Sequence, residues 1–167
     1  MKLSRKEEEK LKLLFELIKD SRRSDRELAK SMKVSQPTVT RKRNTLEKEG
    51  FVEEYTIVPD LAKMGYEIIA FTFLKFQEPP KPELMRDARK WADKQSCIIF
   101  ASDGEGMGMN SVIVSLHRDY RGYTSLIDQL HREWDPNIRD VSSFKISIKR
   151  PELFVKQFSF RYLEKNE

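Results

Sequence analysis

Cysteine is nearly absent from the sequence: Cys97 is the single thiol among 167 residues. A lone cysteine excludes an internal disulfide framework and any zinc site built from several thiolates. Long apolar runs are missing too, since the runs at residues 68–71 and 97–101 have only four and five residues, whereas a membrane-spanning helix needs about 18 apolar residues. The first ten residues are rich in charge and contain no apolar core of a secretion signal. We therefore expect a soluble, cytoplasmic protein without a membrane partner.

Positive charge is concentrated in one short stretch of the chain. The whole sequence carries 32 Lys and Arg against 27 Asp and Glu, a net charge of +5, with a pI near 9.2. Residues 22–43 hold eight basic and two acidic side chains, a net +6, whereas residues 59–167 hold 17 basic and 16 acidic ones. A local basic patch is typical of a polyanion-binding protein, because each neutralised phosphate releases counterions. A solvated charged helix face is the alternative interpretation.

Apolar spacing and capping signals predict three helices in the first fifty residues. The first covers residues 5–20, and its helical spacing predicts a buried stripe of Leu11, Leu14, Phe15 and Ile18. Ser24 and Glu27 have the spacing of a capping box, which begins a second, short helix. A third helix runs from Ser35, its N-cap, to Gly50. A short helix followed closely by a longer basic one indicates a helix-turn-helix.

The helical wheel of the third helix predicts which side chains could contact DNA. Val39 and Leu46 share the inward face, and Arg43 lies beside them, so we assign Arg43 a packing or phosphate-contacting role. Forked Arg, Gln and Asn side chains match base edges, while basic groups and the helix start hold phosphates. The candidate DNA-binding residues are Arg22, Arg23, Lys33, Ser35, Gln36, Thr38, Thr40, Arg41, Lys42, Asn44 and Lys48.

The rest of the chain predicts an α+β protein of two different halves. Residues 51–58 have the pattern of a strand, although Glu53 and Glu54 make it a poor DNA-binding wing. The second half alternates strand and helix in the order β-α-β-β-α-β, which indicates a ferredoxin-like sandwich. Its expected elements are strand 66–76, helix 82–95, strand 97–102, strand 109–117, helix 119–134 and strand 141–149. The expected domains are a winged-helix-like helix-turn-helix domain (1–50), a linker strand and hinge (51–65), the ferredoxin-like domain (66–149) and a C-terminal extension (150–167).

The first strand of the second half is apolar on both sides. Two helices can cover only one face of such a sheet, so the other face needs a partner, and an identical sheet satisfies this requirement. The sequence therefore predicts a homodimer formed through this domain. In the extension, Phe158, Phe160 and Tyr162 alternate, which predicts an additional strand.

Three segments carry a resemblance to a known family: DRELA at 25–29, VSQPTVTR at 34–41 and LEKEGFV at 46–52. Together with the βαββαβ half, they make residues 5–149 resemble the Lrp/AsnC family of prokaryotic transcription regulators, especially its archaeal members. The resemblance implies binding to double-stranded DNA and a C-terminal ligand-sensing domain. It also implies dimers that assemble further, into tetramers or octamers, and regulation by amino acids or related small molecules.

A glycine-rich segment lies between the expected second and third strands of the sandwich. In relatives this turn contributes to an effector pocket, which implies here an effector site of Gly104, Gly106, Met107, Gly108 and Asn110. Exposed backbone amides of such a turn could hold a carboxylate. Asn110 stands where relatives often have Asp, so the partner for the ammonium group of an amino acid is missing. The alternative is a wide hairpin turn whose glycines need positive φ.

Two further hypotheses compete with a sequence-specific DNA-binding regulator. The first is an enzyme, because siroheme decarboxylases resemble this family. Paired carboxylates and a Ser–His–Asp arrangement are not evident; His117 and His131 fit surface or satisfied positions, and Cys97 fits a buried apolar one. We expect no catalytic residue, no metal and no cofactor. The second is a regulator whose C-terminal domain only assembles and binds no effector.

Overall fold

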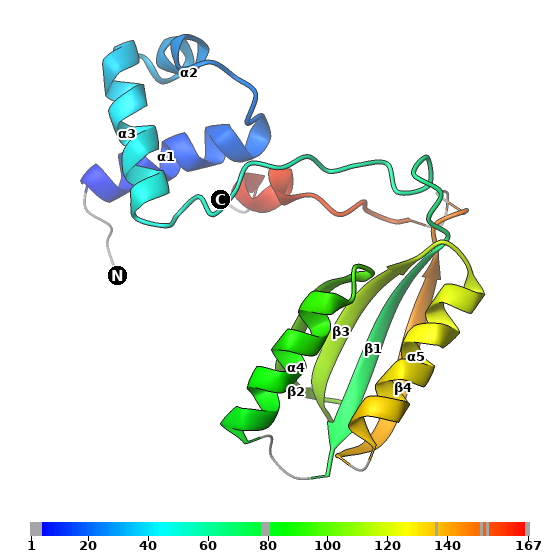
Figure 1. Cartoon of the computed structure of the whole chain (residues 1–167). Coiled ribbons are helices and arrows are strands. Elements are labelled where there is room, and N and C mark those ends of the chain that lie inside the picture. The colour runs from blue at the N-terminus through cyan, green and yellow to red at the C-terminus, as the bar shows by residue number, and fades with distance from the viewer. Residues whose placement is uncertain (1–4, 78–80, 136, 151, 153, 166–167) are drawn as a thin grey trace. The chain divides into compact units, whose positions relative to one another are not determined.

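The computed structural model describes residues 5–77, 81–135, 137–150, 152 and 154–165, and it divides the chain into two compact units (Figure 1). The first unit joins residues 1–58 to residues 156–167, and the second comprises residues 59–155. Both ends of the chain therefore belong to the same unit. None of the helices in the described ranges combines the length and apolar content that a bilayer span requires.

Three helices form the body of the first unit, as the sequence predicts: α1 (Arg5–Lys19), α2 (Asp25–Met32) and α3 (Gln36–Lys48). Ser24 begins α2 with the expected capping box, because its hydroxyl accepts the backbone N–H of Glu27 while the Glu27 carboxylate accepts the N–H of Ser24. Lys33 ends α2 in the left-handed region, with φ of 56°. This tight turn sets the angle at which α3 leaves α2.

The core of the first unit forms where the three helices meet, and it corrects the stripe expected for α1. Its buried residues are Leu13, Leu17, Leu28, Ala29, Val39 and Leu46. Leu13 and Leu17, which were not expected, are 0% and 4% exposed, whereas Leu11, Leu14, Phe15 and Ile18 are only half-buried. The segment LKLLFELI is apolar on adjoining faces, so its spacing fits two stripes. Packing against α2 and α3 selects the stripe that contains Leu13 and Leu17, which are four residues apart.

Two strands expected from the sequence are absent from the first unit. Residues 52–60 have no regular secondary structure, because a strand needs a hydrogen-bonded neighbour and no other described segment pairs with them. Residues 158–162 do not form a strand either; η2 (Phe160–Lys165) is a 3-10 helix that contacts α1. The rings of Phe158 and Phe160 pack edge to face at a centroid distance of 5.2 Å.

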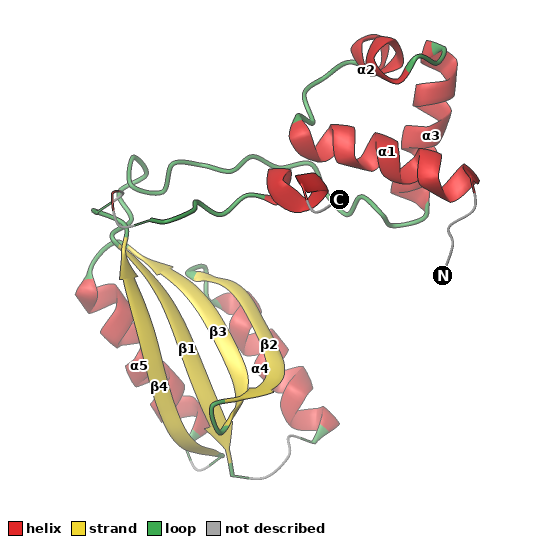
Figure 2. Ribbon diagram, turned by 180° about the vertical axis from the view of Figure 1, so that it is seen from behind, coloured by secondary structure: helices red, strands yellow, loops and turns green. Residues whose placement is uncertain are grey.

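The second unit confirms the βαββαβ order. Its elements are β1 (Ile68–Phe76), α4 (Pro82–Lys94), β2 (Ile98–Gly106), β3 (Met109–His117), α5 (Tyr120–Trp134) and β4 (Ile138–Ser147). The sheet is antiparallel in the order β2-β3-β1-β4. Strand β2 runs farther than expected, to Gly106, because its pairing with β3 continues to the hairpin turn. Figure 2 shows α4 and α5 on the same face of the sheet.

The core of the second unit lies between that face and the two helices. Its buried residues are Leu74, Phe76, Trp91, Ile113, Leu126, Leu130, Trp134 and Ile138. Trp91 from α4 meets Trp134 from α5 edge to face, with ring centroids 6.2 Å apart, a geometry that aromatic quadrupoles favour. The helices are thereby joined to each other as well as to the sheet.

Candidate nucleic-acid interface

Helix α3 presents a polar face above a fully buried one. Val39 and Leu46 are completely buried, as the helical wheel predicts. On the opposite face the exposed residues are Gln36, Thr40, Arg41, Asn44 and Lys48. An open depression follows this face, lined by Gln36, Pro37, Thr40, Arg41, Asn44, Thr45, Lys48 and Glu49. The packing of α3 therefore leaves several forked and basic side chains accessible along one surface.

The N-terminus of α3 is capped and free of negative charge. The Ser35 hydroxyl accepts the backbone N–H of Thr38 and also lies 2.8 Å from the Thr38 hydroxyl. The first turn of α3 contains no acidic residue. The helix dipole therefore meets no carboxylate within that turn, and a helix start of this kind attracts phosphate. In the structure, the side chains of Ser35 and Thr38 are engaged in capping α3.

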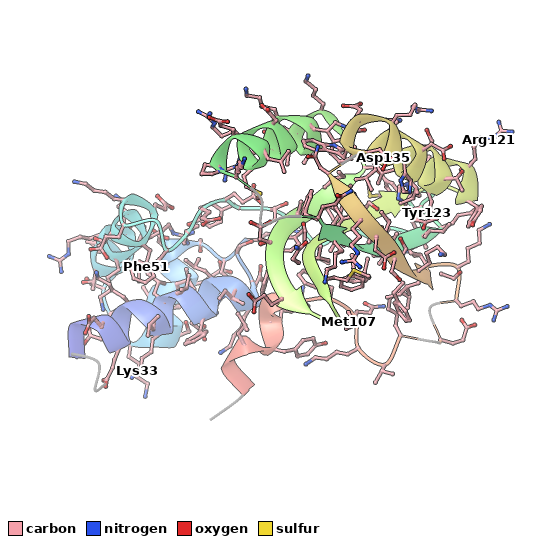
Figure 3. All side chains as sticks on the ribbon, turned by 90° about the horizontal axis from the view of Figure 1, so that it is seen from below. Lys33, Phe51, Met107, Arg121, Tyr123 and Asp135 are labelled. Atoms are coloured by element: carbon pink, nitrogen blue, oxygen red, sulfur yellow. The ribbon has the colours of Figure 1, made fainter. Side chains whose placement is uncertain are left out.

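Two of the predicted DNA-binding residues are engaged in ion pairs. Lys42 donates to Glu9 at 2.7 Å. Arg23 donates to Glu16, whose pKa is held below its usual value by hydrogen bonds from Lys19 and Arg23. Arg22 and Lys33 are exposed, and Lys33 lies at the turn between α2 and α3 (Figure 3). The structure therefore divides the basic residues into exposed ones and ones held against α1.

Arg43 takes the packing role rather than a place on the exposed face. Its Nε donates to Asp25 at 2.8 Å, and its Nη2 donates to the backbone carbonyl of Arg23 at 3.3 Å. Asp25 also accepts from the Thr40 hydroxyl, at 2.6 Å. One carboxylate of α2 thus fixes two side chains of α3. The sequence analysis missed Asp25 because 18 residues separate it from Arg43.

Tyr55 connects the segment after α3 to the same group of residues. Its hydroxyl donates to the Glu47 carboxylate at 2.7 Å and accepts from Arg43 Nη1 at 3.4 Å. The Arg43 guanidinium lies over the Tyr55 ring, 5.9 Å from its centroid. Burial and the hydrogen bond to Glu47 raise the pKa of Tyr55, so the phenol keeps its proton at neutral pH. No local pattern around Tyr55 predicts this contact.

The glycine-rich segment is a tight hairpin, which corrects the expectation of a wide one. Gly106 pairs with Met109, and the two residues between them, Met107 and Gly108, have φ of 52° and 75°. Positive φ at both central positions is typical of a two-residue turn. Met107 lies at the hairpin tip and is 77% exposed (Figure 3). Gly104 is an exposed strand residue, and the Asn110 amide oxygen accepts the backbone N–H of Phe76 at 3.0 Å.

The histidines and the cysteine occupy ordinary structural positions. His117 is only 3% exposed; its Nε2 lies 2.8 Å from the Ser115 hydroxyl, and burial lowers its pKa. His131 is exposed on α5. Cys97 packs against the core, and burial raises the pKa of its thiol. Within the described ranges, no three His, Cys, Asp or Glu side chains gather to hold a metal ion.

The sheet face opposite the helices carries a row of apolar side chains. Phe71 on β1 stands between Val114 of β3 and Phe144 of β4, and Val114 is in turn opposite Phe100 of β2. Phe144 is 65% exposed and Phe100 is 55% exposed. One extra residue in β2, Ile99, shifts the register so that Phe100 pairs with Val114. Large aromatic side chains in such a row mark an interaction surface.

Comparisons with known proteins point to one class. A winged helix-turn-helix DNA-binding family model matches residues 10–53. An uncharacterised HTH-type transcriptional regulator of Pyrococcus horikoshii is 30% identical over 131 residues, which cover 77% of this chain and 82% of that protein. The crystal structure of an AsnC family transcriptional regulator from Agrobacterium tumefaciens matches with a TM-score of 0.76, at 16% identity and 95% coverage of each chain.

A ligand-bound structure has the same fold. The crystal structure of a transcriptional regulator from Neisseria meningitidis in complex with L-Met matches with a TM-score of 0.72, at 15% identity and 96% coverage of each chain. The chain spans about half the length of other curated regulators it matches, 50% for one from Pyrococcus abyssi and 40% for one from Bacillus subtilis. The likeness over most of the chain rests on the Pyrococcus horikoshii protein and on the shared fold.

Proposed function

The chain belongs to the Lrp/AsnC family of transcriptional regulators, and on that premise we propose that it binds double-stranded DNA sequence-specifically through α3, as a homodimer or a higher oligomer. The observation that carries this function is the exposed face of α3, which holds Gln36, Arg41 and Asn44 above the buried Val39 and Leu46. These side chains have the forked groups that match guanine and adenine edges in the major groove.

The exposed and the ion-paired basic residues fit phosphate contacts at different places around α3. Arg22, Lys33 and Lys48 are exposed and fit phosphate contacts on either side of α3. Lys42 and Arg23 fit phosphate contacts at the rim, where Glu9 and Glu16 hold their side chains in place. The capped N-terminus of α3, with Ser35 and Thr38, adds a site for one backbone phosphate. Phosphate contacts fix the register on the duplex, and base contacts supply the sequence preference.

The apolar sheet face supports assembly into a dimer. Aromatic side chains of β1, β2 and β4 line it together with Val114 of β3, and a second copy of the same sheet offers a self-complementary surface around a two-fold axis. A dimer with two such recognition helices should bind a pseudo-palindrome whose half-sites lie about one helical turn (~34–36 Å) apart.

A small-molecule effector is the finer part of the proposal. The bound L-Met of the Neisseria meningitidis regulator supports an amino acid or related molecule as the ligand class. The site would use the β2–β3 hairpin, with Gly104, Gly106, Met107, Gly108 and Asn110, completed by a second subunit. Thermal unfolding of the full chain with each amino acid tests this, because a ligand that binds only the folded state raises the melting temperature. Unchanged melting with every amino acid would favour a domain that only assembles.

The DNA-binding function is tested by selecting bound fragments from a random duplex library and measuring affinity against salt. Arg41→Ala should cost about 1–3 kcal/mol on the selected site and relax the preference at one base pair. Lys48→Ala is the matched control on the same exposed helix, and it should weaken selected and random DNA alike while reducing the salt slope by about 1. A wild-type protein without any preference among duplexes at low salt would refute the function.

A further inference from the structure

The segment that leaves the recognition helix is attached to it at a defined point. Residues 52–60 form no regular secondary structure, so they are not held in place by the hydrogen bonds of a β-sheet. Val52 packs against the core of the first unit, and the Tyr55 hydroxyl bridges Glu47 and Arg43 of α3. Val52 therefore holds the start of this segment, and Tyr55 is the residue beyond it that is hydrogen-bonded to α3.

The side chains to which Tyr55 attaches are themselves bonded to neighbouring elements. Arg43 is bonded to Asp25 of α2 and to the backbone of Arg23 in the loop before α2. Both side chains of the Arg43–Asp25 pair are about four-fifths buried. Through Arg43, Tyr55 is therefore connected to α2 as well as to α3.

Neighbouring residues extend the contact along the α1–α2 loop. A small open depression of the first unit is lined by Ser21, Arg22, Arg43, Tyr55, Thr56 and Ile57. Residues 55–57 therefore run beside residues 21–22. The direction in which the chain continues towards Pro59 is set at this depression.

We propose that Tyr55 is a positioning residue that fixes how the chain leaves α3, and thereby restricts the half-site spacing that the dimer accepts on DNA. This inference rests on the proposed dimeric DNA binding. In a dimer formed through the second unit, each recognition helix is connected to the subunit contact by its exit segment and by the chain that returns at residue 156. A fixed exit direction therefore narrows the range of separations that the two helices can adopt. A free exit segment lets the same helices reach half-sites at several separations. The base preference within one half-site is set by α3 and should not change.

The experiment measures the affinity of the full-length protein for duplexes that carry the selected half-sites at spacings varied in single base-pair steps. Tyr55→Phe keeps the ring and removes the hydroxyl, and Glu47→Ala removes its acceptor. We expect both variants to flatten the spacing profile. The ratio of the affinity at the optimal spacing to the affinity at a neighbouring spacing should fall below half of its wild-type value. Glu47→Gln keeps an oxygen acceptor and should restore most of that ratio.

Tyr66→Phe is the matched control, because it also loses one hydroxyl and its ring instead lies under Arg118 in the second unit; its profile should match wild type. A merely structural effect of Tyr55→Phe would reduce affinity at all spacings by the same factor and leave the profile unchanged. That result, or an unchanged affinity at every spacing, would overturn the inference. A wild-type protein without sequence preference would instead refute the proposed function.

Discussion

His117 should make the stability of the second unit depend on pH. Its burial lowers its pKa, so the unfolded chain takes up a proton before the folded chain does. Its stabilising contribution is therefore complete above the usual histidine pKa of about 6.5 and declines as the pH falls from there through the lowered folded pKa. Asp119, at the start of α5, opposes the shift, and the Lys145 ammonium lies over the neighbouring Tyr123 ring.

The measurement compares urea unfolding of wild type and His117→Gln at about pH 7.5 and about pH 5.5, on either side of that usual value. Wild type should lose more stability than the variant between the two conditions, since Gln does not titrate and the carboxylates are common to both proteins. His131→Gln, which removes an exposed histidine, should behave like wild type. Equal losses for wild type and His117→Gln would show that the pKa of His117 does not differ between the folded and the unfolded chain.

Arg43 shows what sequence reasoning can and cannot obtain for a single residue. The helical wheel placed it beside Val39 and Leu46, and this was enough to predict packing. Its partners Asp25 and Tyr55 lie 18 residues before and 12 residues after it. Such distant contacts depend on how α2 and the exit segment pack against α3, which no periodicity within one element encodes. The exposed residues of α3 were predictable because they depend on helix geometry alone.

Elements whose formation depends on local signals were predicted well. The capping box at Ser24, the apolar run of β1 and the alternation of β3 and β4 correspond to observed elements. Residues 51–58 and 158–162 also have patterns typical of a strand, but a strand needs a neighbouring segment to pair with as well. Likewise, the choice between two apolar stripes on α1 was made by α2 and α3.

The C-terminal helix η2 should stabilise α1 selectively. The chain leaves the first unit after residue 58 and returns at residue 156, where η2 contacts α1. Deleting residues 156–167 removes this contact and leaves every element of the second unit intact. Hydrogen exchange of the full-length and shortened proteins should show faster exchange at α1 amides and unchanged exchange in β1 and β3. Equal protection of α1 in both proteins would mean that η2 contributes nothing to its stability.

At the scale of the whole molecule, we expect the exposed aromatic row of the sheet to form the contact between subunits. A charge at its centre should disrupt a dimer formed face to face, because the carboxylate would be buried without a partner. Phe144→Asp should weaken dimerisation by at least ~30-fold, the equivalent of the ~2 kcal/mol of a central aromatic contact. Phe144 points away from the helices and is largely exposed, so the fold of one subunit should survive.

Light scattering across a dilution series measures this change, and circular dichroism checks the fold. Phe158→Asp provides the matched control: it places the same charge at an exposed phenylalanine of the first unit and should leave the dimer intact. Loss of the dimer should also abolish the preference for a two-half-site duplex over a single half-site, since only a dimer bridges both. A Phe144→Asp protein that still dimerises at the wild-type concentration would place the subunit contact elsewhere on the chain. The half-site spacing would then be determined by that other surface.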